Sequence, residues 1–259
     1  MTLAAFETLR VEIADHVAIV TLDRPPVNAQ LRASQDEIAL CFDQLSDLAE
    51  VRAVVLTGAG KVFSAGADIK ARAAAAPSLG GDRQHLRSAR ESYHAIMECR
   101  KPVIAAINGA ALGAGLALVA SCDILIAAEE AELGLPEVTV GLMGGCRHAM
   151  RLLGHSAVRR MMFTGERLSG AELYRRGVVE ACVPRAALLE TALGIARRIA
   201  ALSPTAVQLA KHSLNTIEEM SLRDGYRFEQ DMTMQLSRSP DAIEAKRAFL
   251  EKRKPVFGG

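Results

Sequence analysis

The chain has 259 residues, of which 50% are hydrophobic, so it can bury a full-sized core as one large domain or as one domain with a helical tail. Its 31 Lys and Arg nearly match its 30 Asp and Glu, and a formal charge of +1 argues against a nucleic-acid partner or an anionic membrane surface. Five cysteines without CxxC or Cys/His ligand spacing argue against a metal site and favour a reducing, cytoplasmic setting.

Neither targeting nor membrane segments are expected. Residues 1–10 lack the basic and apolar regions of a signal peptide, and they lack the Arg- and Ser-rich character of a transit peptide. The longest apolar stretches, 103–107 and 110–120, are shorter than the roughly 20 residues that a spanning helix needs. They are interpreted as buried core elements.

The first part of the chain predicts alternating strands and helices. Two β-branched stretches, Val11–Ile13 and Val17–Thr21, flank Ala14-Asp15 and predict a hairpin that ends at Pro25-Pro26. Helical spacing of apolar residues predicts a helix over 33–48, followed by a buried strand over 53–57. The same rhythm of helix and strand recurs at 84–99, 103–108, 114–120 and 123–127. This alternation is typical of βαβ units.

From about Arg147 onward the strand signal fades and helical patterns take over. They cover 149–153, 156–163, 169–176, 185–202 and 204–220. Further upstream, the alanine-rich segment Ala71–Gly81 is of low complexity and predicts a mobile loop. This loop is either an ordinary surface connection or a lid over a site.

Two glycine-containing turns, 63–70 and 108–115, follow two buried strands. Small residues allow a ligand to approach the backbone closely. If Ala114 begins a helix, its amide is an unpaired donor at the positive end of the helix dipole. One such turn is more often simple chain reversal, but two together predict that the amides of Ala67 and Ala114 converge on one oxyanion, where losing one donor costs about 3 kcal/mol.

At this point the sequence resembles the crotonase, or enoyl-CoA hydratase/isomerase, family. The motifs that carry the resemblance follow one another in order along nearly the whole chain, at 23–29, 64–70, 101–109, 133–137 and 251–254. The resemblance implies an α/β fold, a crotonase-like spiral of βαβ units over 1–195 with a C-terminal helical region over 196–259 that forms trimers or pairs of trimers. It also implies an acyl-CoA thioester as ligand, with coenzyme A as part of the substrate and no separate cofactor.

The resemblance also assigns roles residue by residue. Ala67 and Ala114 match the family's oxyanion donors, and these amides are expected to polarise the thioester carbonyl. The segment that lines the adenine and phosphate region is matched by Ala65, Asp68, Ile69 and Lys70. Arg24 and a neighbouring subunit's Lys252 are further candidates for the coenzyme A phosphates, for which Arg and Lys are suitable donors. The alternative for each cation is an ordinary solvated surface position.

The sequence departs from the family's hydratases at one of their two glutamates. The first falls at Ala117, which cannot transfer a proton, whereas the second is present as Glu137. A single carboxylate can move a proton between two carbons, so Glu137 is expected to catalyse a Δ3-Δ2 enoyl-CoA isomerisation. The apolar residues before it should raise its pKa, although a surface carboxylate is the ordinary alternative. A hydratase with another second acid/base group, and an acyl-CoA-binding protein without catalysis, are the competing hypotheses.

A second departure is the segment 144–148, where the family commonly runs glycine-rich. By position, Arg147 or His148 is a candidate for recognising a polar acyl group, and His148 is a candidate for the missing acid/base function. The alternative is a role at an interface or a helix start. The remaining histidines receive no role, and neither a metal site nor a Cys/His or serine nucleophile is inferred.

Overall fold

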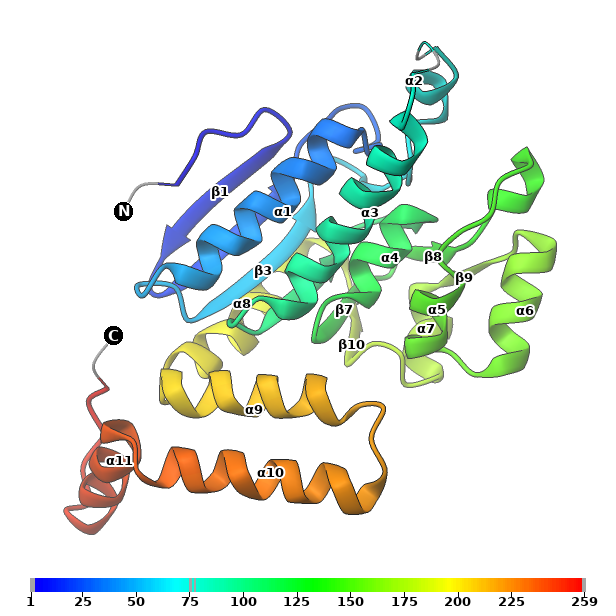
Figure 1. The fold of residues 1–259 in the computed structure, drawn as a ribbon. Coiled ribbons are helices and arrows are strands. Elements are labelled where there is room, and N and C mark those ends of the chain that lie inside the picture. Colours follow the sequence, from blue (N-terminus) through cyan, green and yellow to red (C-terminus); the bar gives the residue numbers. More distant parts are fainter. Residues whose placement is uncertain (1–2, 75, 77, 258–259) are drawn as a thin grey trace.

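The computed structural model of the chain describes residues 3–74, 76 and 78–257 (Figure 1). Its centre is a six-stranded sheet with the order β1-β2-β3-β5-β7-β10. The strands are β1 (Leu9–Ala14), β2 (Val17–Leu22), β3 (Ala53–Gly58), β5 (Val103–Ile107), β7 (Ile124–Ala128) and β10 (Ala181–Val183). The predicted hairpin is confirmed as the antiparallel pair β1 and β2, and the other neighbours run parallel. Parallel neighbours require crossovers, which the intervening helices supply.

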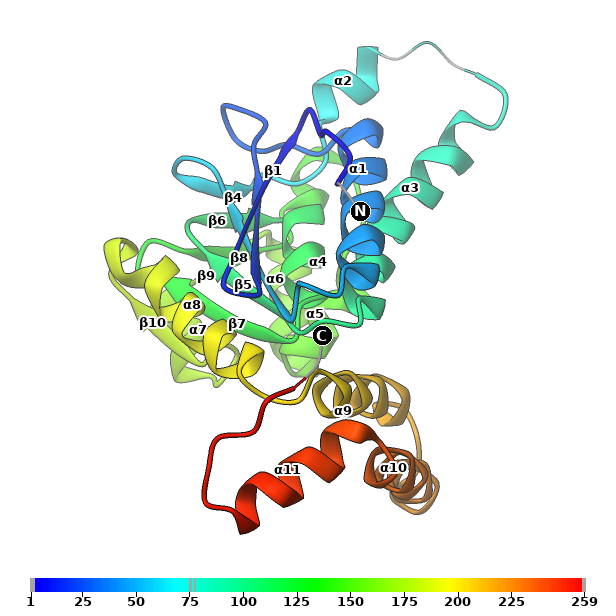
Figure 2. The same ribbon diagram turned by 90° about the vertical axis from the view of Figure 1, so that its left-hand side faces the viewer.

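Helices cover both faces of this sheet, which is why its strands are apolar at nearly every position. On β3, Val54 belongs to one buried cluster and its neighbour Val55 to the other, because successive side chains point to opposite faces. The helices α1 (Arg32–Asp47) and α3 (Gly81–Glu98) pack over the first face, and α8 (Arg185–Ala200) packs over the second (Figure 2).

A second sheet, with the order β4-β6-β8-β9, gives the fold its spiral course. Its strands are β4 (Val62–Ser64), β6 (Ala110–Leu112), β8 (Glu132–Gly134) and β9 (Arg167–Ser169). The central strands β3, β5 and β7 are each followed in sequence by one of these short strands, so the chain repeats the same path. This arrangement confirms the expected α/β spiral. Two segments that leave the second sheet matter most for function: α4 (Ala114–Ala120) after β6, and the 3-10 helix η1 (Glu137–Val140) after β8.

The second half of the chain is mainly helical. It contains α5 (Cys146–Leu152), α6 (His155–Thr164), α7 (Gly170–Arg175), α9 (Pro204–Ile217), α10 (Leu222–Ser237) and α11 (Pro240–Leu250). Serine hydroxyls at 203, 221 and 239 accept hydrogen bonds from amides in the first turns of α9, α10 and α11, which fixes where each helix begins. Buried Lys211 ties α9 to the core, since its Nζ lies 2.8 Å from Asp123 Oδ2. By contrast, α10 and α11 project away from the sheet (Figure 1).

Three expectations need correction. Strands do continue after Arg147, but β9 and β10 have three residues each and are too short to show a period. The expected boundary after residue 195 falls inside α8, which packs on the sheet as one unit, so the helical tail begins after this helix. The predicted loop Ala71–Gly81 begins within α2 (Ile69–Ala74), and its residues 75 and 77 lie outside the described part of the chain. Of the helices described, none is long and apolar enough to cross a membrane.

Candidate active site

The two glycine-containing turns touch each other directly. A Cβ built on Gly66, whose φ is +90°, would lie 2.6 Å from the carbonyl oxygen of Leu112 and 3.3 Å from the amide nitrogen of Ala114. A Cβ on Gly115 would lie 2.4 Å from the carbonyl oxygen of Ser64. The sequence predicted small residues here so that a ligand can approach the backbone. The structure gives a further reason, because only glycine lets the two turns pack this closely.

This contact brings the amides of Ala67 and Ala114 to the same cavity, which has a volume of about 480 Å³. On either side of Ala67 the backbone is bonded to Gln30: the Gly66 carbonyl accepts from the Gln30 amide, and the Asp68 amide donates to the Gln30 carbonyl. The N–H of Ala67 therefore points away from Gln30. Ala114 is the first residue of α4, where amides have no intrahelical acceptor. Within the described ranges neither amide has an acceptor, so both are available to an oxygen of a ligand.

Glu137 begins η1 and lies against the second of these turns. A Cβ on Gly113, whose φ is +54°, would stand 2.5 Å from Glu137 Oε1, so the carboxylate occupies space that only a glycine leaves free. Its other oxygen, Oε2, is buried and finds no hydrogen-bond partner among the described residues. Burial in this apolar setting raises the pKa of Glu137. The result is a carboxylate suited to accept a proton beside the two amides.

The part of the cavity that α4 lines carries no acid among the described residues. Ala117, one turn along α4 from Ala114, lines the cavity and is 1% exposed. Among the described lining residues Glu137 is the one carboxylate. The predicted departure from a two-glutamate site is therefore matched by a cavity with a single acidic group.

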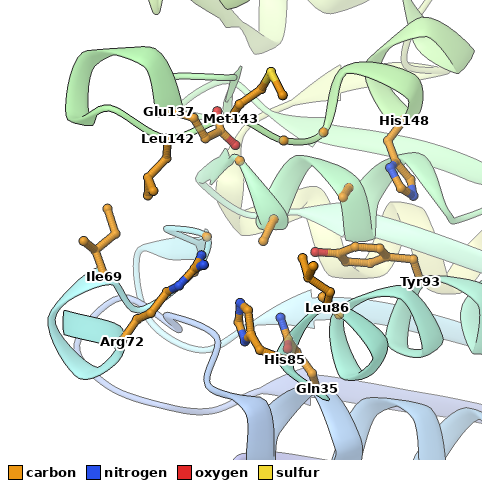
Figure 3. A pocket seen from close by; sticks show the side chains of 18 of the residues that line it. Gln35, Ile69, Arg72, His85, Leu86, Tyr93, Glu137, Leu142, Met143 and His148 are labelled. Atoms are coloured by element: carbon orange, nitrogen blue, oxygen red, sulfur yellow. The ribbon is translucent and has the colours of Figure 1, made fainter. Parts of the chain in front are cut away.

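Aromatic and imidazole side chains form the wall between α3 and α5 (Figure 3). The rings of Tyr93 and His148 meet edge to face, with centroids 4.9 Å apart and an interplanar angle of 69°. Burial raises the pKa of Tyr93, with the charge of Glu137 acting in the same direction. Burial lowers the pKa of His148, assisted by the positive charges of Arg151, His94 and Arg147. At neutral pH the phenol and the imidazole are both uncharged.

Several residues that line the cavity have no role predicted from the sequence. His85, Tyr93 and His94 are among them. They lie on α3 together with Leu86 and Ala89, and the positions 86, 89 and 93 have the spacing of one helical face. That spacing was a usable signal, but it does not reveal which face of a helix borders a cavity.

The segment expected to hold coenzyme A divides into two parts. Ala65 and Ile69 line the cavity, and Lys70 is exposed at the start of α2. Asp68 and Arg24 are instead paired with each other, with Nη1 of the arginine 2.9 Å from Oδ2 of the aspartate. A hydrogen bond from the Ala71 amide, together with Arg24, holds the pKa of Asp68 below its ordinary value.

Arg147 and Lys252, the two remaining predicted residues, also do not line this cavity within one chain. Arg147 is turned outward and pairs with Glu219, because consecutive residues of α5 point in different directions and His148 takes the inward one. Within one chain Arg147 therefore does not line the cavity, and its position in the first turn of α5 agrees with the alternative of a helix-start role. Lys252 follows α11, at the opposite end of the molecule from α2, as Figure 1 shows.

The spiral fold and its cavity define a class of protein, the crotonase-type α/β enzymes. A family model described as enoyl-CoA hydratase/isomerase matches residues 12–259, and the chain belongs to this family. It is therefore an acyl-CoA enzyme, which speaks against the hypothesis of a binding protein without catalysis.

Individual relatives agree with this assignment. The chain is 38% identical over 260 residues to a probable enoyl-CoA hydratase of Rhizobium meliloti, with 98% of each chain covered. It is 34% identical over 249 residues to 2,3-dehydroadipyl-CoA hydratase of Escherichia coli, covering 94% of this chain and 95% of the relative. A crystal structure of enoyl-CoA hydratase from Bacillus anthracis matches with a TM-score of 0.91 and 36% identity, covering 97% of this chain and 99% of that one.

Proposed function

We propose that the enzyme moves a double bond in an enoyl-CoA by proton transfer through one carboxylate, in the manner of a Δ3-Δ2 enoyl-CoA isomerase. The observation that carries the proposal is the position of Glu137. Its carboxylate lies against Gly113, beside the Ala114 amide, while Ala117 on α4 lines the same cavity. Hydration is easiest with two acid/base groups, whereas isomerisation needs one.

In the proposed reaction the thioester oxygen accepts hydrogen bonds from the amides of Ala67 and Ala114. Glu137 removes a proton from the α-carbon of a 3-enoyl thioester, and the electron pair of that C–H bond spreads over a dienolate whose charge rests largely on the thioester oxygen. The same carboxyl group then returns the proton to the γ-carbon, which gives the conjugated 2-enoyl thioester. Atoms and charges balance within the substrate and Glu137, so the reaction requires no cofactor.

The test is proton exchange at carbon in the Glu137→Gln variant. The amide keeps the shape of the carboxylate but cannot take a proton, and we expect both isomerisation and deuterium incorporation at the α- and γ-carbons to fall about 100- to 10,000-fold. The surface variant Glu229→Gln on α10 serves as the matched control and should exchange normally. Unchanged exchange in Glu137→Gln would refute the assignment.

A hydratase is the second candidate, and the position of His148 favours it. The imidazole lines the same cavity as Glu137, and its lowered pKa keeps it neutral and able to handle a proton. The names of the relatives also favour hydration. Under this alternative, wild-type enzyme removes the conjugated thioester absorbance of crotonyl-CoA by adding water, and His148→Gln abolishes that reaction while leaving the deuterium exchange that depends on Glu137.

For the coenzyme A part we propose that Ala65, Asp68, Ile69 and Lys70 hold the adenine and phosphate region. Arg24 and Lys252 of a neighbouring copy would add positive charge. A trimer or a pair of trimers would bring that lysine near, and this assembly is supported by exposed apolar side chains on the C-terminal helices: Leu222, Phe249 and Leu250 are 91%, 83% and 80% exposed. We place the enzyme in the cytoplasm, where its five free cysteines suit a reducing compartment.

A further inference from the structure

The hydroxyl of Tyr93 points into the cavity and lacks a partner there. Figure 3 shows the phenol oxygen directed to the space between Leu86 and the turn that carries Glu137. In the described part of the chain this hydroxyl has no hydrogen-bond partner. Besides burial, the negative charge of Glu137 contributes to the raised pKa of Tyr93. The ring cannot turn freely, since His148 packs against it edge to face. The molecule thus holds the phenol hydroxyl at a fixed place in the cavity wall.

The hydroxyl acts as a donor. Burial and the nearby carboxylate both raise the pKa of Tyr93, so the phenol keeps its proton at neutral pH. A complex in which the ligand displaces water from this hydroxyl and offers it no acceptor loses a hydrogen bond and is destabilised. The bound substrate is therefore expected to supply an acceptor at this place.

A plain enoyl thioester has no acceptor to spare. Its carbonyl oxygen is the one that the amides of Ala67 and Ala114 would hold, and the rest of its acyl chain is hydrocarbon. Glu137 is the one carboxylate among the described residues that line the cavity, and its free Oε2 makes no hydrogen bond to Tyr93. Glu218 and Glu219, which line a neighbouring pocket with His148, pair with Arg151 and Arg147 instead.

We propose that the acyl group of the substrate carries an oxygen acceptor, a keto or carboxylate group, beyond its double bond, and that Tyr93 recognises this oxygen. His148 acts as the residue that positions the phenol. The inference rests on the proposed function in that it places the acyl chain in the cavity of Glu137. It goes further by naming the chemical class of the acyl group.

Binding of saturated six-carbon thioesters tests the inference without any turnover. Calorimetry would compare hexanoyl-CoA with 5-oxohexanoyl-CoA and adipoyl-CoA, which differ only at the far end of the chain. We expect wild-type protein to bind at least one oxygenated probe about tenfold to a hundredfold more tightly than hexanoyl-CoA. The preferred probe shows whether the oxygen is a ketone or a carboxylate.

Tyr93→Phe is the matched variant, because it removes only the hydroxyl and keeps the ring against His148. It should abolish the preference and leave hexanoyl-CoA affinity within about twofold, while the exposed Tyr174→Phe on α7 changes neither. Equal affinities for the three probes in wild-type protein would overturn the inference, as would a preference that survives Tyr93→Phe or an equal loss for all probes. Failure of the isomerase proposal is recognised separately, since Glu137→Gln would then leave proton exchange unchanged.

Discussion

Gly113 and the carboxylate of Glu137 fit together so closely that a Cβ on the glycine would stand 2.5 Å from Oε1. The glycine also has a φ of +54°, a backbone conformation that residues with a side chain rarely adopt. The absence of a side chain at this position therefore allows the conformation of the turn and also leaves room for the carboxylate of Glu137. One contact, between Gly113 and Glu137, thus sets the position of the proposed base relative to the Ala114 amide.

Gly113→Ala should disrupt this contact. We expect the new methyl group to push the Glu137 carboxylate aside and to strain the turn by about 1–3 kcal/mol, and we expect kcat to fall at least about a hundredfold. Steady-state kinetics and thermal unfolding measure the two effects. Gly194→Ala on α8, where a Cβ meets open space, is the control and should preserve both activity and Tm. Normal activity in Gly113→Ala would contradict the importance of this fit.

Glu137 should limit activity at low pH. Its pKa is raised above the ordinary value of 4.5, and catalysis needs the ionised form, so kcat/KM should fall as the pH drops through that raised pKa. A profile that stays flat well below pH 4.5 would speak against Glu137 as the base.

The same group should cost stability at neutral pH. A raised pKa in the folded state means that folding favours the protonated form, so this contribution is fully present below the unfolded pKa and is lost as pH rises through the folded one. Glu137→Gln stays neutral throughout, and its Tm should exceed that of wild type near pH 7 but not below about pH 4. Glu229→Gln, on the surface of α10, should show no such crossover.

Ala117→Glu tests whether one missing carboxylate separates the two chemistries. The new side chain would enter the cavity that Glu137 lines, where a second acid/base group can help to add water. We expect crotonyl-CoA hydration to rise at least about tenfold over wild type, as measured by loss of the conjugated thioester absorbance. Ala117→Gln supplies the bulk without the acid and should not gain it. A gain in both variants, or in neither, would show that the carboxylate is not the deciding feature.

Arg24→Gln should weaken recognition of coenzyme A. The guanidinium lies beside Asp68 at the start of α2, and a charge-assisted contact to a phosphate is expected to change KM for the acyl-CoA about tenfold to a hundredfold. The corresponding acyl-pantetheine, which lacks the nucleotide, should be turned over equally well by both proteins. Arg10→Gln removes a comparable surface pair with Asp23 and should be neutral. An equal loss with the pantetheine substrate would mean that Arg24 acts through the local structure.

Lys211→Met should loosen α9 from the core. The ammonium is 5% exposed and donates to Asp123 and to the carbonyl oxygen of Lys101, so its removal leaves a partly buried carboxylate unpaired, at a cost of about 3–5 kcal/mol. Urea unfolding measures this loss, and the exposed Lys246→Met provides the control. Adding Asp123→Asn should recover part of the stability, because an amide oxygen can still accept from the Val103 amide. A single variant as stable as wild type would contradict this role.

Much of the central fold could be predicted because its strands and helices have a clear period. The hairpin, the parallel strands β3, β5 and β7, and the helix that starts at Ala114 all follow from apolar spacing and from residues that end elements. The three-residue strands could not be predicted in this way. Their partner strands lie far away in sequence, so the local spacing of apolar residues does not indicate the pairing.

The candidate site was predictable where it depends on the backbone. The glycine-containing turns predict the amides of Ala67 and Ala114, and the apolar setting together with the family motif predicts Glu137. Tyr93 was not found, because its part in the cavity depends on how α3 packs against α5. The outward position of Arg147 was not predictable for the same reason, since residues adjacent in sequence point to different sides of a helix.

The two free amides have a consequence for how such an enzyme can evolve. A mutation changes a side chain but leaves the peptide group, so the carbonyl activation that we propose for the amides of Ala67 and Ala114 would persist under most substitutions. The positions to which we assign the choice of substrate and reaction, 93, 117, 137 and 148, act through side chains and can be exchanged one at a time. One scaffold can thus acquire a new reaction through few steps without passing through an ancestor that has lost its hold on the thioester.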